Sequence, residues 1–185
     1  MATMIGNGRD VVSFLQAQHN QIKALFQNVI SATGDQRSKA FYELRRLLAV
    51  HETAEEEIVH PAARRALPNG EAVVAARLHE ENQAKKVLAD LEKLDVSSAE
   101  FLTQIRTLQA AVIAHAESEE REEFSRLADH IEPARLEKMR KAAELAEAVA
   151  PTRPHAGVES AIANMFAGPF ASMVDRTRDA LTGKR

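Results

Sequence analysis

The sequence of 185 residues contains no cysteine. Without thiols the chain cannot form disulfides, zinc–thiolate sites or iron–sulfur clusters, so any metal has to be held by histidine and carboxylate side chains. Aromatic residues make up only 4% of the chain, and β-branched residues are sparse as well. Strand signals are therefore nearly absent, and the expected fold class is all-α.

Long apolar runs and an excess of basic charge are also missing. No stretch approaches the roughly 18 apolar residues that a membrane span needs, and the segment Met1–Asp10 lacks the layout of a signal peptide. We therefore expect a cytoplasmic protein without a membrane anchor. The net charge is −3, with acidic and basic residues interspersed, so nucleic-acid binding is not expected.

Long periodic runs of Ala, Leu, Glu, Lys and Arg predict a small number of long helices. Breaks rich in glycine and proline separate them, at residues 33–35 and 67–70 and before Pro133. The predicted helices cover about residues 10–31, 36–66, 70–94 and 97–130. Because their connections are short, we expect an up-down-up-down four-helix bundle formed by residues 1–132.

Residues 133–185 are predicted to form a helical extension that packs on this bundle. A fifth helix should cover about residues 134–149, and a stiff link with two prolines follows. The last segment then places apolar residues on one side, namely Val158, Ile162, Met165, Phe170, Val174 and Leu181. This stripe either covers the outside of the bundle or forms a homodimer or partner surface.

Several histidines and glutamates fall on the apolar seams of the predicted helices, where positions recur at spacings of three and four. The first seam contains His19 between Leu15 and Ile22. The second and fourth seams each contain a His-x-x-x-Glu unit, and the third contains one glutamate. The inward polar residues are His19, His51, Glu55, Glu81, His115 and Glu119.

Any one of these residues has an ordinary structural explanation, because a lone histidine on an apolar face usually bonds a backbone carbonyl. Three buried carboxylates with three imidazoles are different, since burying ionised groups without compensating charge is costly. Counted from the predicted turns, all six residues lie at about one depth in the bundle. Six ligands from four helices suit two metal ions bridged by carboxylates. The alternative is a structural bundle without metal.

Three segments resemble the hemerythrin-like (HHE) family. They are residues 14–26, FLQAQHNQIKALF; residues 47–61, LLAVHETAEEEIVHP; and residues 112–124, VIAHAESEEREEF. The resemblance covers roughly Val11 to Ile131. It implies a non-haem di-iron pair with an oxo or hydroxo bridge, with Glu55 and Glu119 as bridging ligands and His19, His51 and His115 as terminal ligands.

The third helix departs from the family pattern, because Glu81 stands where the family usually has a histidine. His79 is close by, but two residues rotate it about 200° around the helix, so we expect Glu81 to be the ligand and His79 to lie on the surface. Glu52, which follows His51, is a further candidate ligand, since some family members use the residue beside the histidine of the second segment. His60 should lie nearly opposite His51, as a helix-end residue or as a neighbour of the ligands.

The family spans oxygen carriage, oxygen or iron sensing, chemistry related to nitric oxide, and peroxide breakdown. An anionic Glu81 in place of a neutral imidazole should stabilise the ferric state, which favours peroxide turnover over reversible oxygen carriage. The first hypothesis is therefore catalase-like reaction with hydrogen peroxide or a related small oxidant. The alternatives are a protein that binds or senses oxygen or nitric oxide, and an interaction module gated by iron.

Overall fold

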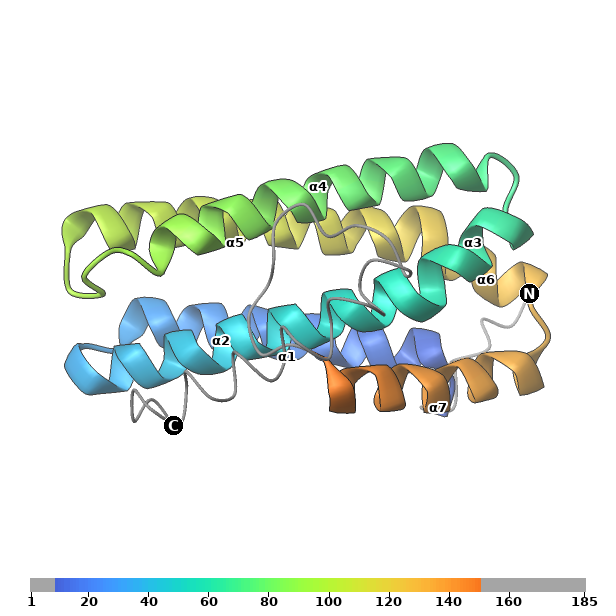
Figure 1. Cartoon of the computed structure of the whole chain (residues 1–185), viewed down its shortest axis with the longest axis horizontal. Coiled ribbons are helices and arrows are strands. Elements are labelled where there is room, and N and C mark those ends of the chain that lie inside the picture. The colour runs from blue at the N-terminus through green and yellow to red at the C-terminus, as the bar shows by residue number, and fades with distance from the viewer. Residues whose placement is uncertain (1–8, 151–185) are drawn as a thin grey trace.

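The computed structural model describes residues 9–150, and these residues form helices joined by short connections, with no strand among them (Figure 1). This confirms the all-α fold class. The elements are α1 (Val11–Ser31), α2 (Gly34–Ala54), η1 (Glu55–Val59), α3 (His60–Ala66), α4 (Gly70–Leu91), α5 (Ala99–Glu119), η2 (Glu120–Phe124), α6 (Ser125–His130) and α7 (Pro133–Val149). The predicted stripe Val158–Leu181 lies outside the described residues.

Four long rods make up the bundle: α1, the continuous run α2–η1–α3, α4, and the run α5–η2–α6. Successive rods run antiparallel in Figure 1 and are joined by residues 32–33, 67–69 and 92–98. The backbone of Gly70, at the start of α4, lies so close to α3 that the position requires glycine. A Cβ on Gly70 would clash with the backbone of Ala63 and Arg64. At the rod starts, Asp10 and Ser98 accept hydrogen bonds from backbone N–H groups of the first turn.

Two hydrophobic cores fill the bundle, one toward each end. One includes Leu15, Phe124 and Leu127, and the other includes Ile22 and Phe101. Burying each such side chain contributes about 1.5–3 kcal/mol. Along α1, the buried residues between Leu15 and Ile22 are Gln18 and His19, so a polar layer separates the two cores.

Helix α7 packs on the bundle against α1 and α2 (Figure 1). Its residues Leu136, Met139 and Ala143 are buried and join the core that contains Leu15. This helix lies at the same end of the bundle as the short helices α3 and α6. A fifth helix therefore covers part of the outer surface of the first two rods.

A π-helical turn begins at Glu55, the last residue of the first His-x-x-x-Glu unit, and another begins at Glu120, directly after the second unit. The N–H of His60 donates to the carbonyl of Glu55, and the N–H of Ser125 donates to the carbonyl of Glu120, which is the i to i+5 pattern of a π turn. Such a turn inserts one extra residue into the helix, while the helix completes the turn that it would have completed without it. Every residue beyond it is therefore turned by about 100° relative to an uninterrupted α-helix.

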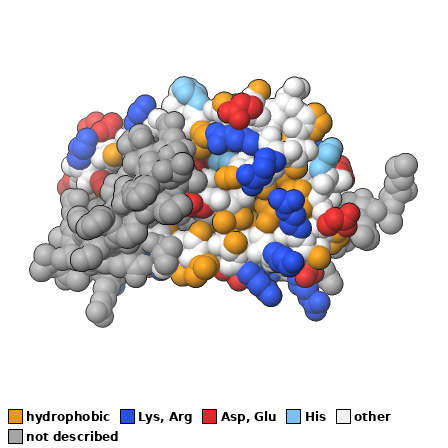
Figure 2. All heavy atoms as spheres, turned by 45° about the vertical axis from the view of Figure 1, so that its right-hand side comes forward, with side chains coloured by type: hydrophobic (Ala, Val, Ile, Leu, Met, Phe, Trp, Pro, Cys, Tyr) orange, Lys and Arg blue, Asp and Glu red, His pale blue; other side chains and the backbone are white. Residues whose placement is uncertain are grey.

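No helix in residues 9–150 combines the length and the apolar character that crossing a membrane requires. On the face that Figure 2 shows, basic side chains are spread among hydrophobic and acidic ones. The expectation that the chain does not bind nucleic acid stays a prediction.

Candidate metal centre

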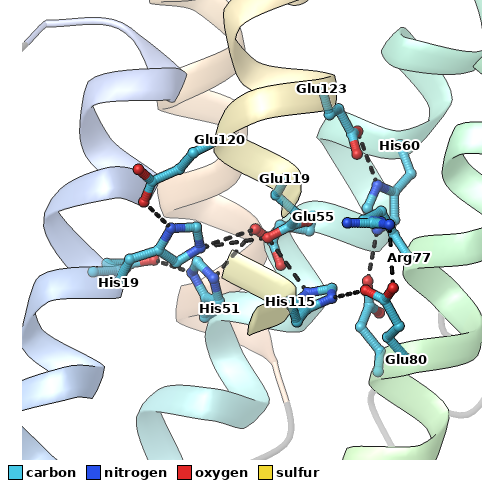
Figure 3. A network of polar contacts seen from close by, with 12 residues as sticks. His19, His51, Glu55, His60, Arg77, Glu80, His115, Glu119, Glu120 and Glu123 are labelled. Atoms are coloured by element: carbon cyan, nitrogen blue, oxygen red, sulfur yellow. Dashed lines mark hydrogen bonds and ion pairs between the residues drawn. The ribbon is translucent and has the colours of Figure 1, made fainter. Parts of the chain in front are cut away.

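The structure brings all six predicted residues into the polar layer between the two cores. They form two overlapping groups whose ligand atoms lie within 4.8 Å of one another. The first group is His19, His51, Glu55 and Glu119, and the second is Glu55, Glu81, His115 and Glu119. Glu55 and Glu119 belong to both groups, and Figure 3 shows them between His19 and His51 on one side and His115 on the other. This is the arrangement that two ions sharing two carboxylates require.

The three histidines point their Nε2 atoms at these shared carboxylates. The distance from His51 Nε2 to Glu55 Oε1 is 3.2 Å. From His19 Nε2 and from His115 Nε2 to Glu119 Oε2, the distance is 3.4 Å in each case. In each imidazole the inner nitrogen therefore faces the cluster.

The outer nitrogen, Nδ1, of each imidazole contacts an acceptor. His19 Nδ1 lies 2.8 Å from Glu120 Oε1, and His115 Nδ1 lies 2.9 Å from Glu80 Oε2. His51 Nδ1 lies 2.8 Å from the amide oxygen of Gln18. When Nδ1–H donates to these oxygens, Nε2 keeps its lone pair, which is how histidines that bind metals are usually held.

The shared carboxylates lack hydrogen-bond donors. Among the described residues, none donates to either oxygen of Glu55 or Glu119, and Oε2 of Glu81 and Nε2 of His19 are also without a hydrogen bond. Both shared glutamates have a solvent exposure of 0%. A buried carboxylate without donors or a cation is costly, so these atoms fit a metal-bound state far better than a metal-free one.

The third helix contributes Glu81 rather than His79 to this layer. Glu81 is buried, whereas His79 is exposed and contacts Gln83 on the same helix. The about 200° rotation between the two positions accounts for this difference. Glu81 is therefore the α4 residue that faces His115 and the shared carboxylates.

His60 does not lie on the side opposite His51, but it is a neighbour of the ligands, which was one of the two expected roles. His60 has an exposure of 1%, and its Nε2 lies 2.8 Å from Glu81 Oε1 while its Nδ1 lies 3.0 Å from Glu123 Oε1 (Figure 3). In an uninterrupted α-helix, nine residues would place it about 180° from His51, but the π turn η1 reduces this angle to about 80°. Glu123 lies four residues after Glu119 and also faces the inner side.

Glu123 was not among the six predicted residues, although it lies four residues after Glu119 on the same helix face. Together with His60 and Glu119 it forms a third group with ligand atoms within 4.8 Å of one another. The helical period does mark it, because the spacing of four from Glu119 continues the seam that contains His115 and Glu119. A repeated His-x-x-x-Glu unit followed by further glutamates is the one sequence feature common to both turns.

A second set of buried charges adjoins the cluster. The Lys85 ammonium pairs with Glu56 and lies 3.7 Å from Glu52 Oε2 and 4.0 Å from Glu81 Oε2. Glu52, the further ligand candidate, is thus buried beside a lysine and is in neither of the two overlapping groups. Burial raises the pKa of Glu52 to about 8, although the nearby Lys85 opposes this shift.

The pKa values in the layer reflect the cost of burying charge. Burial lowers the pKa of His51 to about 3, so its imidazole is neutral, as a metal ligand must be. Burial also raises the pKa of Glu55 to about 7. For Glu81, burial is outweighed by the positive charge and hydrogen bond of His60, which lower its pKa to about 2.

A cavity of about 420 Å³ reaches the cluster from the surface. Its inner wall includes His51, Glu81 and His115, and exposed Gln83 and Thr107 also line it. Much of the remaining wall is apolar, formed by Ile22, Leu48, Ala84, Val87, Leu108, Ala111 and Val112. Since a water molecule takes up about 30 Å³ in the liquid, the cavity admits small oxidants and diatomic molecules.

These features define a helical bundle with a buried cation-binding layer of histidines and carboxylates. The sequence model of the family described as "Hemerythrin HHE cation binding domain" matches residues 10–127. The chain belongs to this family. The match ends before α7, which begins at Pro133.

Two known proteins are similar to the chain. The crystal structure of a hemerythrin HHE cation binding domain-containing protein from Mycobacterium kansasii superposes with a TM-score of 0.66 at 22% identity, covering 75% of this chain and 85% of that one. A DNA nickase from a Nostoc species is 23% identical over 123 residues, which is 66% of this chain. The chain spans about a third, 34%, of the length of that curated relative. The structural likeness supports the fold.

Proposed function

We propose that the chain binds a pair of iron ions in the polar layer and that the loaded protein breaks down hydrogen peroxide. The observation that carries the metal pair is the set of four carboxylate oxygens on Glu55 and Glu119 that no donor satisfies, with three imidazole Nε2 atoms directed toward them. The ligands would be His19, His51 and His115 as terminal groups, Glu55 and Glu119 as bridging groups, and Glu81 on the side of His115.

The charge of the layer supports bound metal ions. Six buried carboxylates surround it, namely Glu52, Glu55, Glu56, Glu81, Glu119 and Glu123. Lys85 and the imidazolium of His60 lie among them, and Glu81 and Glu123 raise the pKa of His60 against the effect of burial. The carboxylates also raise the pKa values of His19 and His115, which would have to lose their protons to bind metal. The carboxylates outnumber Lys85 and His60, so metal ions that replace the protons on the ligands would supply the positive charge that the layer lacks. A ligand set of imidazole nitrogens and carboxylate oxygens suits iron.

The protein side chains set the properties of such a site. The acceptors Gln18, Glu80 and Glu120 hold the imidazole rings so that Nε2 is available. Glu81 adds a negative charge where a neutral imidazole would add none, and this favours the more highly charged ferric state. The apolar wall of the cavity limits bulk water around the cluster while leaving room for a small oxidant.

A bound iron pair would supply a two-electron redox couple, which suits the net conversion of two hydrogen peroxide molecules to one oxygen and two water molecules. This reaction needs no other reductant, because one peroxide molecule is oxidised and the other is reduced. Binding or sensing of oxygen or nitric oxide at the same site is the alternative. In that case the protein would bind the small molecule without converting it.

The test is oxygen release from hydrogen peroxide, measured with an oxygen electrode and expressed per bound iron. The loaded wild type should release one oxygen for every two peroxide molecules consumed, whereas the metal-free protein should release none. Glu81→His should slow this turnover by about 10-fold or more and lengthen the life of any oxygen adduct. His79→Ala is the matched control on the same helix and should change little, because His79 is exposed.

Loss of turnover in His79→Ala with unchanged turnover in Glu81→His would contradict the assignment of the α4 ligand. A loaded wild type that binds oxygen reversibly and releases none from peroxide would favour the alternative function.

A further inference from the structure

A hydrogen-bonded chain connects helix α7 to the metal centre. The Gln18 amide nitrogen Nε2 donates to Oε1 of Glu147 at 2.7 Å. The amide oxygen of the same Gln18 lies 2.8 Å from Nδ1 of His51. Gln18 is buried and Glu147 is half-buried. A residue on α7, outside the segment matched by the family, therefore lies two hydrogen bonds away from a proposed ligand.

His51 differs from the other two proposed histidine ligands in the group that accepts from its Nδ1. For His19 and His115 the acceptor is a carboxylate, Glu120 or Glu80, which cannot donate when ionised. For His51 the acceptor is an amide, which carries an acceptor oxygen and a donor NH₂ on the same carbon. The amide of Gln18 alone does not decide which of the two faces His51.

Glu147 determines the orientation of the Gln18 amide. Its carboxylate accepts hydrogen bonds, so the NH₂ of Gln18 has to face it and the amide oxygen has to face His51. The reversed amide would place its oxygen against the carboxylate and its NH₂ against Nδ1. With the oxygen facing His51, the imidazole proton is held on Nδ1 and Nε2 keeps its lone pair.

The competing arrangement is close at hand, because Glu55 Oε1 lies 3.2 Å from Nε2 of His51. A proton on Nε2 would face this carboxylate and would block metal binding at that nitrogen. We propose that Glu147 on α7 is a positioning residue that, through Gln18, fixes the His51 tautomer that can bind metal. The effect on metal affinity rests on the proposed function, whereas the effect on the tautomer does not.

The tautomer can be measured directly in the metal-free protein by ¹⁵N NMR of the histidine rings. The wild type should show His51 with the proton on Nδ1. Glu147→Gln keeps the size of the side chain but can both donate and accept, so the Gln18 amide can reverse and the Nε2–H tautomer should appear. Iron or cobalt affinity should fall in proportion to the lost fraction of the Nδ1–H form, about 2- to 10-fold.

The double variant Gln18→Glu with Glu147→Gln is the rescue. It places a carboxylate next to His51 and a donor behind it, so it should restore the Nδ1–H tautomer.

Two controls on α7 separate this role from packing. Glu144→Gln removes a charge that pairs with Arg140 at the surface, and Met139→Ala removes buried volume. Met139→Ala should lower the melting temperature, and neither should change the tautomer.

An unchanged tautomer in Glu147→Gln, an equal change in Glu144→Gln, or no restoration in the double variant would overturn the proposal. If the wild type binds no metal, the proposed function fails, while the tautomer measurement still decides the role of Glu147.

Discussion

Glu55 should destabilise the metal-free protein and stabilise the loaded one. Its side chain has an exposure of 0%, and no described residue donates a hydrogen bond to either oxygen. The substitution Glu55→Gln removes the buried charge with almost no change in shape. We therefore expect the metal-free variant to be more stable than the wild type near neutral pH, although it loses a proposed bridging ligand.

The magnitude follows from the pKa of Glu55, which burial raises from 4.5 to about 7. Since the folded state holds this proton more tightly than the unfolded state, the metal-free protein loses stability as the pH rises from about 4.5 to 7. The loss approaches about 3 kcal/mol, because each pKa unit corresponds to about 1.4 kcal/mol. The glutamine amide does not titrate but is imperfectly paired, so we expect a net gain of about 1–3 kcal/mol at pH 7.5.

The assay is urea unfolding of the metal-free proteins at pH 5 and pH 7.5, followed by the same measurement with iron. The gain of Glu55→Gln should be larger at pH 7.5 than at pH 5, and iron should stabilise the wild type but not the variant. Glu117→Gln, an exposed glutamate on α5, is the matched control and should have little effect. The reasoning is refuted if metal-free Glu55→Gln is less stable than the wild type at pH 7.5, or if iron stabilises both proteins equally.

Three further substitutions test the buried charges beside the cluster and the turn between α3 and α4, each by thermal or urea unfolding. His60→Ala removes the cation between Glu81 and Glu123 and should cost the metal-free protein about 3–5 kcal/mol; a loss below 1 kcal/mol would contradict the buried ion pairs. Lys85→Met should cost a similar amount, whereas Lys86→Met on the exposed face should be nearly neutral; equal effects would argue against the buried lysine. Gly70→Ala should cost about 1–3 kcal/mol, because its Cβ meets the backbone of α3; an unchanged melt would show that this turn is looser.

The fold could be predicted largely from local signals. The breaks around Gly34 and Gly70 and before Pro133 are encoded by residues that end or start helices in any context, and the observed helices begin and end close to them. The six inward residues could be placed for a related reason, because the 3.6-residue period holds up to each of them. His19 and Glu81 lie on helices without a π turn, and the other four lie before a π turn or at its edge.

The rest of the site depends on features that the 3.6-residue helical period does not describe, or that were not considered with it. The π turn η1 shifts His60 into the layer, and no propensity rule locates a π turn. Glu123 is different, because it lies four residues after Glu119 and the helical period alone could have placed it. The acceptors Glu80 and Glu120 are neighbours of seam residues and look like ordinary exposed-face glutamates in the sequence. The contact of Gln18 with Glu147 joins residues 129 positions apart, so it follows only from the docking of α7.

Two iron ions should share Glu55 and Glu119, and metal content after reconstitution tests this most directly. Iron per chain should be measured by elemental analysis on folded, desalted protein, with His51→Ala, His115→Ala and Glu119→Ala beside the wild type. We expect about two irons per chain in the wild type, a lower content in each histidine variant, and the largest loss in Glu119→Ala, because this carboxylate belongs to both ligand groups. A full content of two irons in Glu119→Ala, or no iron in the folded wild type, would contradict the account.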